Sequence, residues 1–211
     1  MKALSGSMGK TFAGAWRAVT RLSGDVSGIA ATEFAIIVPI MLVMFFGTVE
    51  FSSAIAIKRK VTTMARTVSD LTSQAAVITD SDLTNFFTAS LGVMTPYAAG
   101  PTNVTVSELY IDPSSGNARV QWSKGAAPRG AGTPVTIPPG LVSRDSSNNV
   151  LANQYLIFGE VNYLYTPAVG YVLKSGVTLS DVAYTRPRQT TCVFYPSTPT
   201  PALCPTKTSS P

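Results

Sequence analysis

This chain of 211 residues contains no histidine and only two cysteines. The absence of histidine excludes Ser-His-Asp and Cys-His nucleophile pairs, and it removes the commonest protein ligand of metal ions. Only 11 residues are acidic, and the close pair Asp80 and Asp82 is typical of a helix cap. No glycine-rich loop is followed by the Lys-Ser or Lys-Thr of a phosphate site. We therefore expect no catalytic residue, metal site, cofactor or small-molecule substrate, although the composition leaves open a serine hydrolase with a lysine base.

Positive charge exceeds negative charge, with 16 lysines and arginines against 11 acids and a net charge of +5. The basic residues gather mainly on the two sides of one apolar run. They are Lys2, Lys10, Arg17 and Arg21 before it, and Lys58, Arg59, Lys60 and Arg66 after it. Such flanking clusters are typical of contacts with lipid headgroups, so we expect membrane lipid, and not nucleic acid, as a partner.

The apolar run covers residues 34–49 without a charge and continues to Ile57, with Glu50 as the one charged residue. A helix over 34–57 would be roughly 36 Å long, which is enough to cross a hydrocarbon core of about 30 Å. We interpret it as one transmembrane helix; the alternative is the buried central helix of a soluble domain. Pro39 predicts a kink in this helix, because proline removes a backbone donor. Glu50 is expected to be hydrated or paired with a basic neighbour.

The carboxylate of Glu33 stands at the start of this run. An ionised glutamate inside a bilayer costs on the order of 2.5 to 3.5 kcal/mol, so it requires a cationic partner. Gly28 suggests one, because cleavage after this residue would give Ile29 a free ammonium group and make Glu33 the fifth residue of the new chain. The ammonium group of a neighbouring subunit would then neutralise Glu33. Cleavage after Gly24 is the rival, and it would make Glu33 the ninth residue.

A resemblance to a known family rests on residues 28–51. The segment reads Gly28-Ile-Ala-Ala-Thr-Glu-Phe-Ala-Ile-Ile-Val-Pro39, followed by Leu42, Gly47 and Val49-Glu-Phe51. It resembles the TadE-like family, the minor pilins or pseudopilins of the Flp/Tad (tight adherence) type IV pilus system, and the aromatic Phe34 after Glu33 is typical of that branch. The resemblance implies a prepilin peptidase that cuts between Gly28 and Ile29. It also implies that other Tad pilus components and pilins are partners in cell adhesion.

The same resemblance implies a single-pass protein of the bacterial inner membrane, with its C-terminal domain in the periplasm or in a pilus at the cell surface. We divide the chain into four parts. They are a basic cytoplasmic leader (1–28), the transmembrane helix (29–57), a periplasmic α+β domain (58–190) and a Cys/Pro-rich tail (191–211).

The two cysteines, Cys192 and Cys204, lie twelve positions apart near the C-terminus. A disulfide between them would stabilise the fold by about 3 kcal/mol and would require an oxidising compartment such as the periplasm. The alternative is a pair of unrelated free thiols.

Helical periodicity continues beyond the span to Gln74. The apolar face of this extension consists of Val61, Met64, Ala65, Val68 and Leu71. This spacing predicts a pilin-like helix that leaves the membrane and packs one side on its own domain. A second helix is predicted over 83–91, with capping residues at 79–82 and with Gly92 and Pro96 after its end.

From residue 103 the pattern changes to alternation, which predicts strands over 103–112, 118–124, 154–166, 171–174 and 177–185. In the second strand, Ala118, Val120 and Trp122 are expected on one face. The stretch 125–140, with Arg129 in its middle, is a predicted loop; loops often carry binding residues, but composition alone does not assign this one a partner. The fold class is therefore α+β, with one transmembrane helix that extends into an amphipathic helix, followed by a small antiparallel β-sheet domain.

Two functions fit these features. The first is a minor pilin or pseudopilin that is cut after Gly28 and pairs with its neighbours through Glu33. The second is an uncleaved single-span envelope protein whose external domain is a binding module. We favour the first because Gly28, Glu33, Phe34 and the apolar run occur together.

Overall fold

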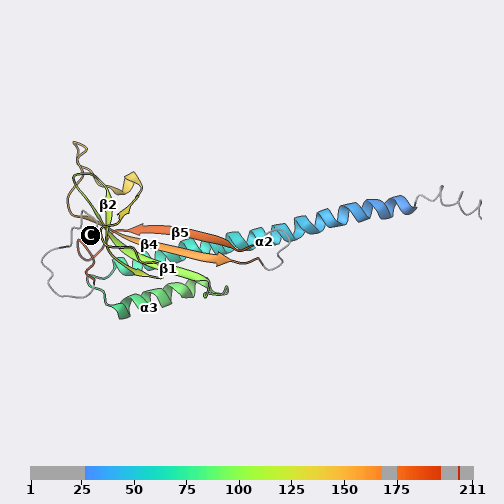
Figure 1. Ribbon diagram of the computed structural model, residues 1–211, viewed down its shortest axis with the longest axis horizontal. Coiled ribbons are helices and arrows are strands. Elements are labelled where there is room, and N and C mark those ends of the chain that lie inside the picture. The colour runs from blue at the N-terminus through green and yellow to red at the C-terminus, as the bar shows by residue number, and fades with distance from the viewer. Residues whose placement is uncertain (1–26, 168–174, 196–203, 205–211) are drawn as a thin grey trace, which may run out of the picture. The chain divides into compact units, whose positions relative to one another are not determined.

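The computed structural model describes residues 27–167, 175–195 and 204. The chain divides into two compact units, Met1–Val49 and Glu50–Pro211. The described part of the first unit is helical, and the second unit combines helices with one sheet (Figure 1). The predictions for the leader before residue 27 and for a strand over 171–174 lie outside the described residues.

Helix α2 runs from Ser27 to Ser73, so it begins in the first unit and ends in the second. Pro39 lies inside the helix. Beyond Glu50, the predicted apolar face is confirmed as the buried face. Its fully buried members are Val61, Met64, Ala65 and Val68.

Helix α3 runs from Asp80 to Leu91 and is followed by the short 3-10 helix η1 over Gly92–Met94. Its predicted cap is confirmed, because the Thr79 hydroxyl accepts from the amide of Asp82 at 3.2 Å and the Asp82 carboxylate accepts from the amide of Thr79 at 2.9 Å. This reciprocal capping box satisfies two amides that have no partner within the helix.

The sheet has five strands in the order β3-β2-β1-β4-β5, and every neighbouring pair is antiparallel. The strands are β1 (Thr102–Ile111), β2 (Ala118–Gly125), β3 (Pro134–Val135), β4 (Gln154–Tyr165) and β5 (Val177–Thr185). The 3-10 helix η2 (Pro139–Leu141) lies between β3 and β4. The predicted α+β fold with a small antiparallel sheet is confirmed.

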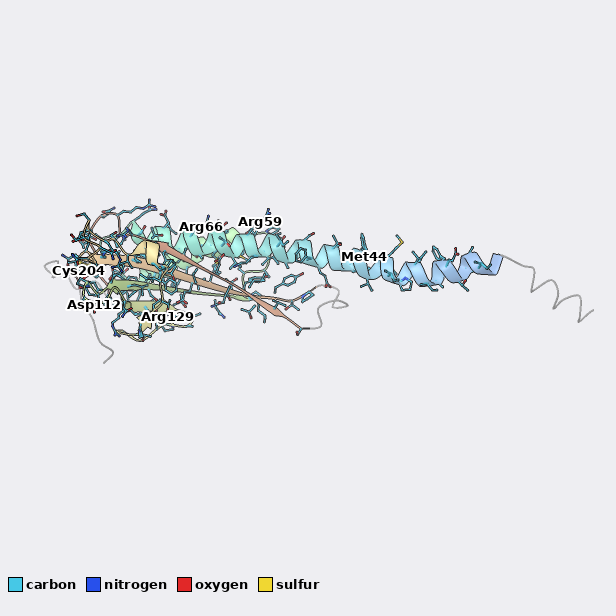
Figure 2. The ribbon with its side chains drawn as sticks, turned by 90° about the horizontal axis from the view of Figure 1, so that it is seen from above. Met44, Arg59, Arg66, Asp112, Arg129 and Cys204 are labelled. Carbon is cyan, nitrogen blue, oxygen red and sulfur yellow. A yellow bond between two sulfur atoms is a disulfide. The ribbon has the colours of Figure 1, made fainter. Side chains whose placement is uncertain are left out.

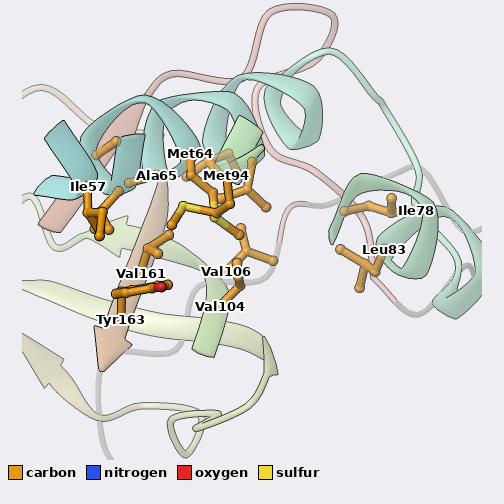
Figure 3. Packing of buried hydrophobic residues seen from close by; sticks show 14 of the residues in the cluster. Ile57, Met64, Ala65, Ile78, Leu83, Met94, Val104, Val106, Val161 and Tyr163 are labelled. Carbon is orange, nitrogen blue, oxygen red and sulfur yellow. The ribbon is translucent and has the colours of Figure 1, made fainter. Parts of the chain in front are cut away.

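The main core lies between one face of this sheet and the helices α2 and α3. Figure 3 shows Ile57, Met64 and Ala65 of α2 beside Val161 and Tyr163 of β4. The helix lies close to β4 at Gly159, where an added Cβ would lie 2.8 Å from the carbonyl oxygen of Ala65. The sheet therefore covers the apolar side of the second half of α2.

A second, smaller core covers the opposite face of the sheet and contains Ala118 and Val120 of β2. Trp122 belongs instead to the main core, so the prediction that these three residues share a face is wrong. The register between β1 and β2 shifts at this point, since Glu108 pairs with Trp122 while Leu109 pairs with Val120. The extra residue of this β-bulge reverses the facing of the side chains that follow it.

Candidate functional site

The residues of the predicted processing and pairing site lie in the first turns of α2. Gly28, Ile29, Glu33 and Phe34 are all exposed, and Phe34 retains 69% of its accessible surface. Ile29 and Glu33 are four positions apart, so the two residues lie on the same side of the helix, one turn apart. An added Cβ on Gly28 would meet nothing within 4 Å. These positions are thus accessible on the surface of the helix.

The apolar run presents side chains on all sides of α2. Its exposed large residues are Phe34, Ile36, Ile37, Ile40, Met41, Leu42, Val43, Met44, Phe45 and Val49. α2 is the one described helix long and apolar enough to cross a membrane, and none of its most apolar 18-residue stretch is buried. Figure 2 shows the labelled Met44 projecting away from the helix. A helix with an apolar surface all round is typical of a membrane span, so this helix indicates single-pass membrane anchoring.

Pro39 borders a shallow hollow of about 270 Å³ on α2, together with Ile40, Val43 and Met44. The hollow has no polar lining residue. The kink expected at Pro39 stays a prediction.

Two of the four basic residues after the run are engaged by the domain. Lys58 donates to the carbonyl oxygen of Ser180 and forms an ion pair with Asp181 at 3.1 Å. Lys60 donates to the carbonyl oxygens of Val93 at 2.9 Å and Thr95 at 2.7 Å. Lys58 and Lys60 were predicted to contact lipid headgroups, but in the structure they attach α2 to the rest of the second unit.

Glu50 does not follow the expectation of a hydrated carboxylate, because only 3% of its surface is exposed. The hydroxyl of Tyr165 donates to the carbonyl oxygen of Glu50 at 3.3 Å. The end of β4 thus covers the point at which α2 enters the second unit.

Arg129, in the middle of the predicted loop 125–140, is paired within the chain. Its Nε donates to the Glu160 carboxylate at 2.8 Å, a second donor of the guanidinium contacts the other carboxylate oxygen, and the guanidinium carbon lies 5.7 Å from the centre of the Phe158 ring. The neighbouring carboxylate raises the pKa of Arg129 further above its usual value. This contact ties the loop to β4.

A disulfide joins Cys192 to Cys204, whose Cα atoms are 5.8 Å apart. Cys192 is fully buried, whereas the Cys204 side chain is partly exposed. The amide of Phe194 donates to the carbonyl oxygen of Ala76, and the amide of Ile78 donates back to the carbonyl oxygen of Phe194. The C-terminal segment therefore packs against the connection between α2 and α3.

Glu108 is a fully buried carboxyl group that the sequence analysis missed. Its two oxygens accept from the amide of Val193 at 2.5 Å and from Nε1 of Trp122 at 3.0 Å. Burial raises the pKa of Glu108 to about 8, although both hydrogen bonds act in the opposite direction. A signal for this residue was present, because Glu108 occupies an inward position in the alternation that begins with Val104 and Val106.

A polar cluster borders a groove of about 420 Å³ between α3 and the ends of β1 and β2. The Asp80 carboxylate accepts from the Tyr195 hydroxyl at 2.6 Å and pairs with Lys124 at 3.2 Å, and these contacts hold the pKa of Asp80 below its usual value. Each polar group of this cluster is thus occupied by another. Among the residues that the structure describes, no three acids or cysteines come together as a metal site.

Residues 28–70 match the family model described as TadE-like protein. The chain therefore carries a TadE-like segment. This segment contains the exposed site at Gly28, Ile29, Glu33 and Phe34 together with the apolar run, and it indicates a protein associated with a Tad pilus system. No curated protein and no solved structure matches the chain.

Proposed function

We propose that the protein is a minor pilin or pseudopilin of a Tad pilus system. It is inserted into the inner membrane as a single-span precursor, and a prepilin peptidase cuts it between Gly28 and Ile29. The domain that begins after the span then lies in the periplasm, as a structural component and not as an enzyme. The observation that carries the proposal is the joint presence of Gly28, Glu33 and the exposed apolar run in one TadE-like segment.

Cleavage after Gly28 creates the positive charge with which Glu33 pairs. The new ammonium group of Ile29 is a cation at the start of an apolar helix, and the carboxylate of Glu33 is an anion one helical turn further along. In a medium of low dielectric constant these charges attract strongly, so the ammonium group of one subunit holds the carboxylate of the next in register. The exposure of both residues supports a contact between chains. Pairing within one chain is the competing arrangement, because the two residues are one helical turn apart.

N-terminal sequencing of the protein from cells with and without the prepilin peptidase tests the cleavage. We expect Ile29 as the first residue only when the peptidase is present, and Gly28→Ser should leave the precursor uncut. The substitution has room, since nothing lies within 4 Å of the added Cβ. Gly24→Ser is the matched control and should be processed normally. An intact Met1 in both strains would contradict the proposal and favour the uncleaved binding module.

The pairing of subunits is tested by co-purification of the processed protein with other pilins. Glu33→Gln keeps the size of the side chain but removes its charge, so we expect normal membrane insertion and weaker recovery of partner pilins. Thr32→Ala is the control, because the Thr32 hydroxyl donates to the carbonyl oxygen of Ile29 in its own helix. Equal recovery with Glu33→Gln and with the native chain would show that the charge does not pair subunits.

A further inference from the structure

The end of the second unit at Glu50 is joined directly to the apolar run. Residues 27–49 of α2 would extend about 34 Å along the helix axis, and this length is enough for a hydrocarbon core of about 30 Å. With the span taken as residues 27–49, and not as the 29–57 expected from the sequence, this end of the unit lies where the span ends, because Val49 is bonded to Glu50. The membrane surface is therefore next to the residues that surround Glu50.

Among the described residues, a part of the surface at this end carries no charged side chain. A hollow of about 390 Å³ lies there, between the start of the second unit's part of α2 and the end of β4. Its lining residues are Ser53, Ile57, Tyr97, Ala98, Pro101, Tyr163, Leu164, Tyr165 and Thr166. None of the nine is charged. Tyr97 is partly exposed, and tyrosine is enriched where proteins meet the lipid headgroups, whereas Tyr163 and Tyr165 are buried in the main core.

Large apolar side chains at this end of the unit are exposed, Leu164 in the lining of the hollow and the others outside it. Leu164 of β4 is 50% exposed and Val177 at the start of β5 is 39% exposed. The two strands pair here, with Leu164 opposite Thr178 and Tyr165 opposite Val177. On α2, Phe51 is 67% exposed and Ile55 is 39% exposed.

The first basic residue after Glu50 on α2 is Lys58, and it is paired with Asp181. The uncharged helical stretch 51–57 rises about 10 Å. A headgroup layer on one side of a bilayer is about 5 to 8 Å thick by the difference between total and hydrocarbon thickness. The uncharged stretch is thus long enough to pass through this layer.

We propose that this end of the domain, defined by Phe51, Ile55, Tyr97, Leu164 and Val177, is a lipid-binding surface that inserts into the headgroup layer of the membrane. The occupant of the hollow is phospholipid, whose glycerol and upper acyl region covers Leu164 and Val177. The proposal rests on the membrane anchor. It adds that the folded domain, and not only the helix, contacts the bilayer.

The test places a tryptophan at this surface in the full-length chain, reconstituted in vesicles of phosphatidylethanolamine and phosphatidylglycerol. Part of the lipid carries bromine near the glycerol end of its acyl chains, and bromine quenches tryptophan on contact. We expect Leu164→Trp to lose much of its emission in brominated vesicles. Val177→Trp is a second probe in case the first substitution disturbs the fold, and it should behave in the same way.

Leu151→Trp is the matched control, since Leu151 is 45% exposed and precedes the opposite end of β4. The ten residue steps from Gln154 to Leu164 span roughly 33 Å of strand, so this probe should keep its emission. All variants carry Trp16→Phe to remove one native signal. The other native tryptophan, Trp122, is buried and common to all.

A probe in the span separates this proposal from the anchor itself. If Phe45→Trp is quenched but Leu164→Trp and Val177→Trp are not, the anchor stands and the lipid-binding surface is overturned. If Phe45→Trp is also unquenched, both are overturned. Acrylamide in the aqueous phase quenches tryptophan that is exposed to water. If Leu164→Trp is protected from acrylamide only at a high protein-to-lipid ratio and is not quenched by bromine, a second copy of the chain covers this surface. That result also overturns the proposal.

Discussion

Glu108 shows how a single buried residue connects the C-terminal segment to the sheet. One carboxyl oxygen holds the backbone of Val193, and the other holds the indole of Trp122, which in turn donates to the carbonyl oxygen of Val193 at 2.9 Å. The Tyr155 hydroxyl has a pKa raised above its usual value, mainly by burial and also by the charge of Glu108. The protonation of Glu108 therefore affects the stability of this closed network.

The stability of the protein should fall as pH rises through the range in which Glu108 ionises. Folding raises the pKa of Glu108 from 4.5 to about 8, so the folded chain keeps a proton that the unfolded chain releases between these values. The free energy of unfolding should decrease from about pH 5 to 8 by a few kcal/mol and level off above that range. Melting temperatures of the full chain in detergent at several pH values provide the measurement.

Glu108→Gln removes this titration, and the melting temperature of the variant should depend less on pH over the same range. Asp112→Asn is the control, because the Ser114 hydroxyl and amide hold the pKa of Asp112 below its usual value and outside the range. Equal slopes for the native chain and Glu108→Gln would contradict the assignment.

β4 lies close to α2 at Gly159, and a methyl group there should be destabilising. The added Cβ of Gly159→Ala would lie 2.8 Å from the carbonyl oxygen of Ala65 and 3.1 Å from side-chain carbons of Val68 and Ser69. Overpacking of this kind lowers the free energy of unfolding by about 1 to 3 kcal/mol. Unfolding by a chemical denaturant measures this loss. Gly92→Ala is the control, since Gly92 has a φ of −57° and open space at its Cβ. A loss as large at Gly92 would show that the contact with α2 is not the cause.

At the scale of elements, the C-terminal segment acts as a strap, and its described residues 186–195 and 204 form no helix or strand. Val77 and Phe194 form an isolated parallel bridge, and the disulfide lies next to it in the chain. Cys192 packs with Tyr110 and Tyr155 in a small cluster of its own. The strap therefore combines a covalent link with a buried contact.

Reduction of the disulfide should lower the free energy of unfolding by about 3 kcal/mol, the value expected for a loop of this size. The midpoint of urea unfolding with and without reductant measures the change. Cys204→Ser should match the reduced native chain and should not respond to reductant. Cys204 is the better position for this change because Cys192 is fully buried, and a hydroxyl there would add its own cost. A native chain insensitive to reductant would contradict the prediction.

At the scale of the whole molecule, α2 belongs to both compact units. Its first part carries the apolar surface of the span. Its second part fills the main core with Ile57, Val61, Met64 and Val68. One helix thus serves both membrane anchoring and the folding of the domain.

A fragment over 50–211 should therefore fold, whereas a fragment over 74–211 should not. Each large apolar side chain that α2 buries contributes roughly 1.5 to 3 kcal/mol to the free energy of folding. The loss of the whole set is as large as the net stability of a typical domain, which is about 5 to 15 kcal/mol. Near-ultraviolet circular dichroism and thermal unfolding distinguish the two outcomes. Cooperative unfolding of the shorter fragment would show that the sheet does not depend on α2.

The sequence alone was sufficient for the longer described helices and strands, although β3 and η2 lie at or within the stretch 125–140 that was predicted as a loop. The apolar run, the cap at Thr79 and the alternation in β4 are local patterns, and the backbone follows local patterns within a few residues. Gly28, Glu33 and Phe34 were recognisable because they occur together in one short segment. The division of the chain into four parts, the cleavage and the kink at Pro39 stay predictions.

Only the tertiary structure decided which groups meet across the chain. The bulge in β2 places Trp122 on the same face of the sheet as Glu108. Arg129, in the predicted loop, pairs with Glu160 of the same chain. Glu50 is buried by the domain. These outcomes depend on strand register and on contacts between residues far apart in the sequence. A one-residue shift in register reverses the facing of a strand, and local periodicity does not reveal such a shift.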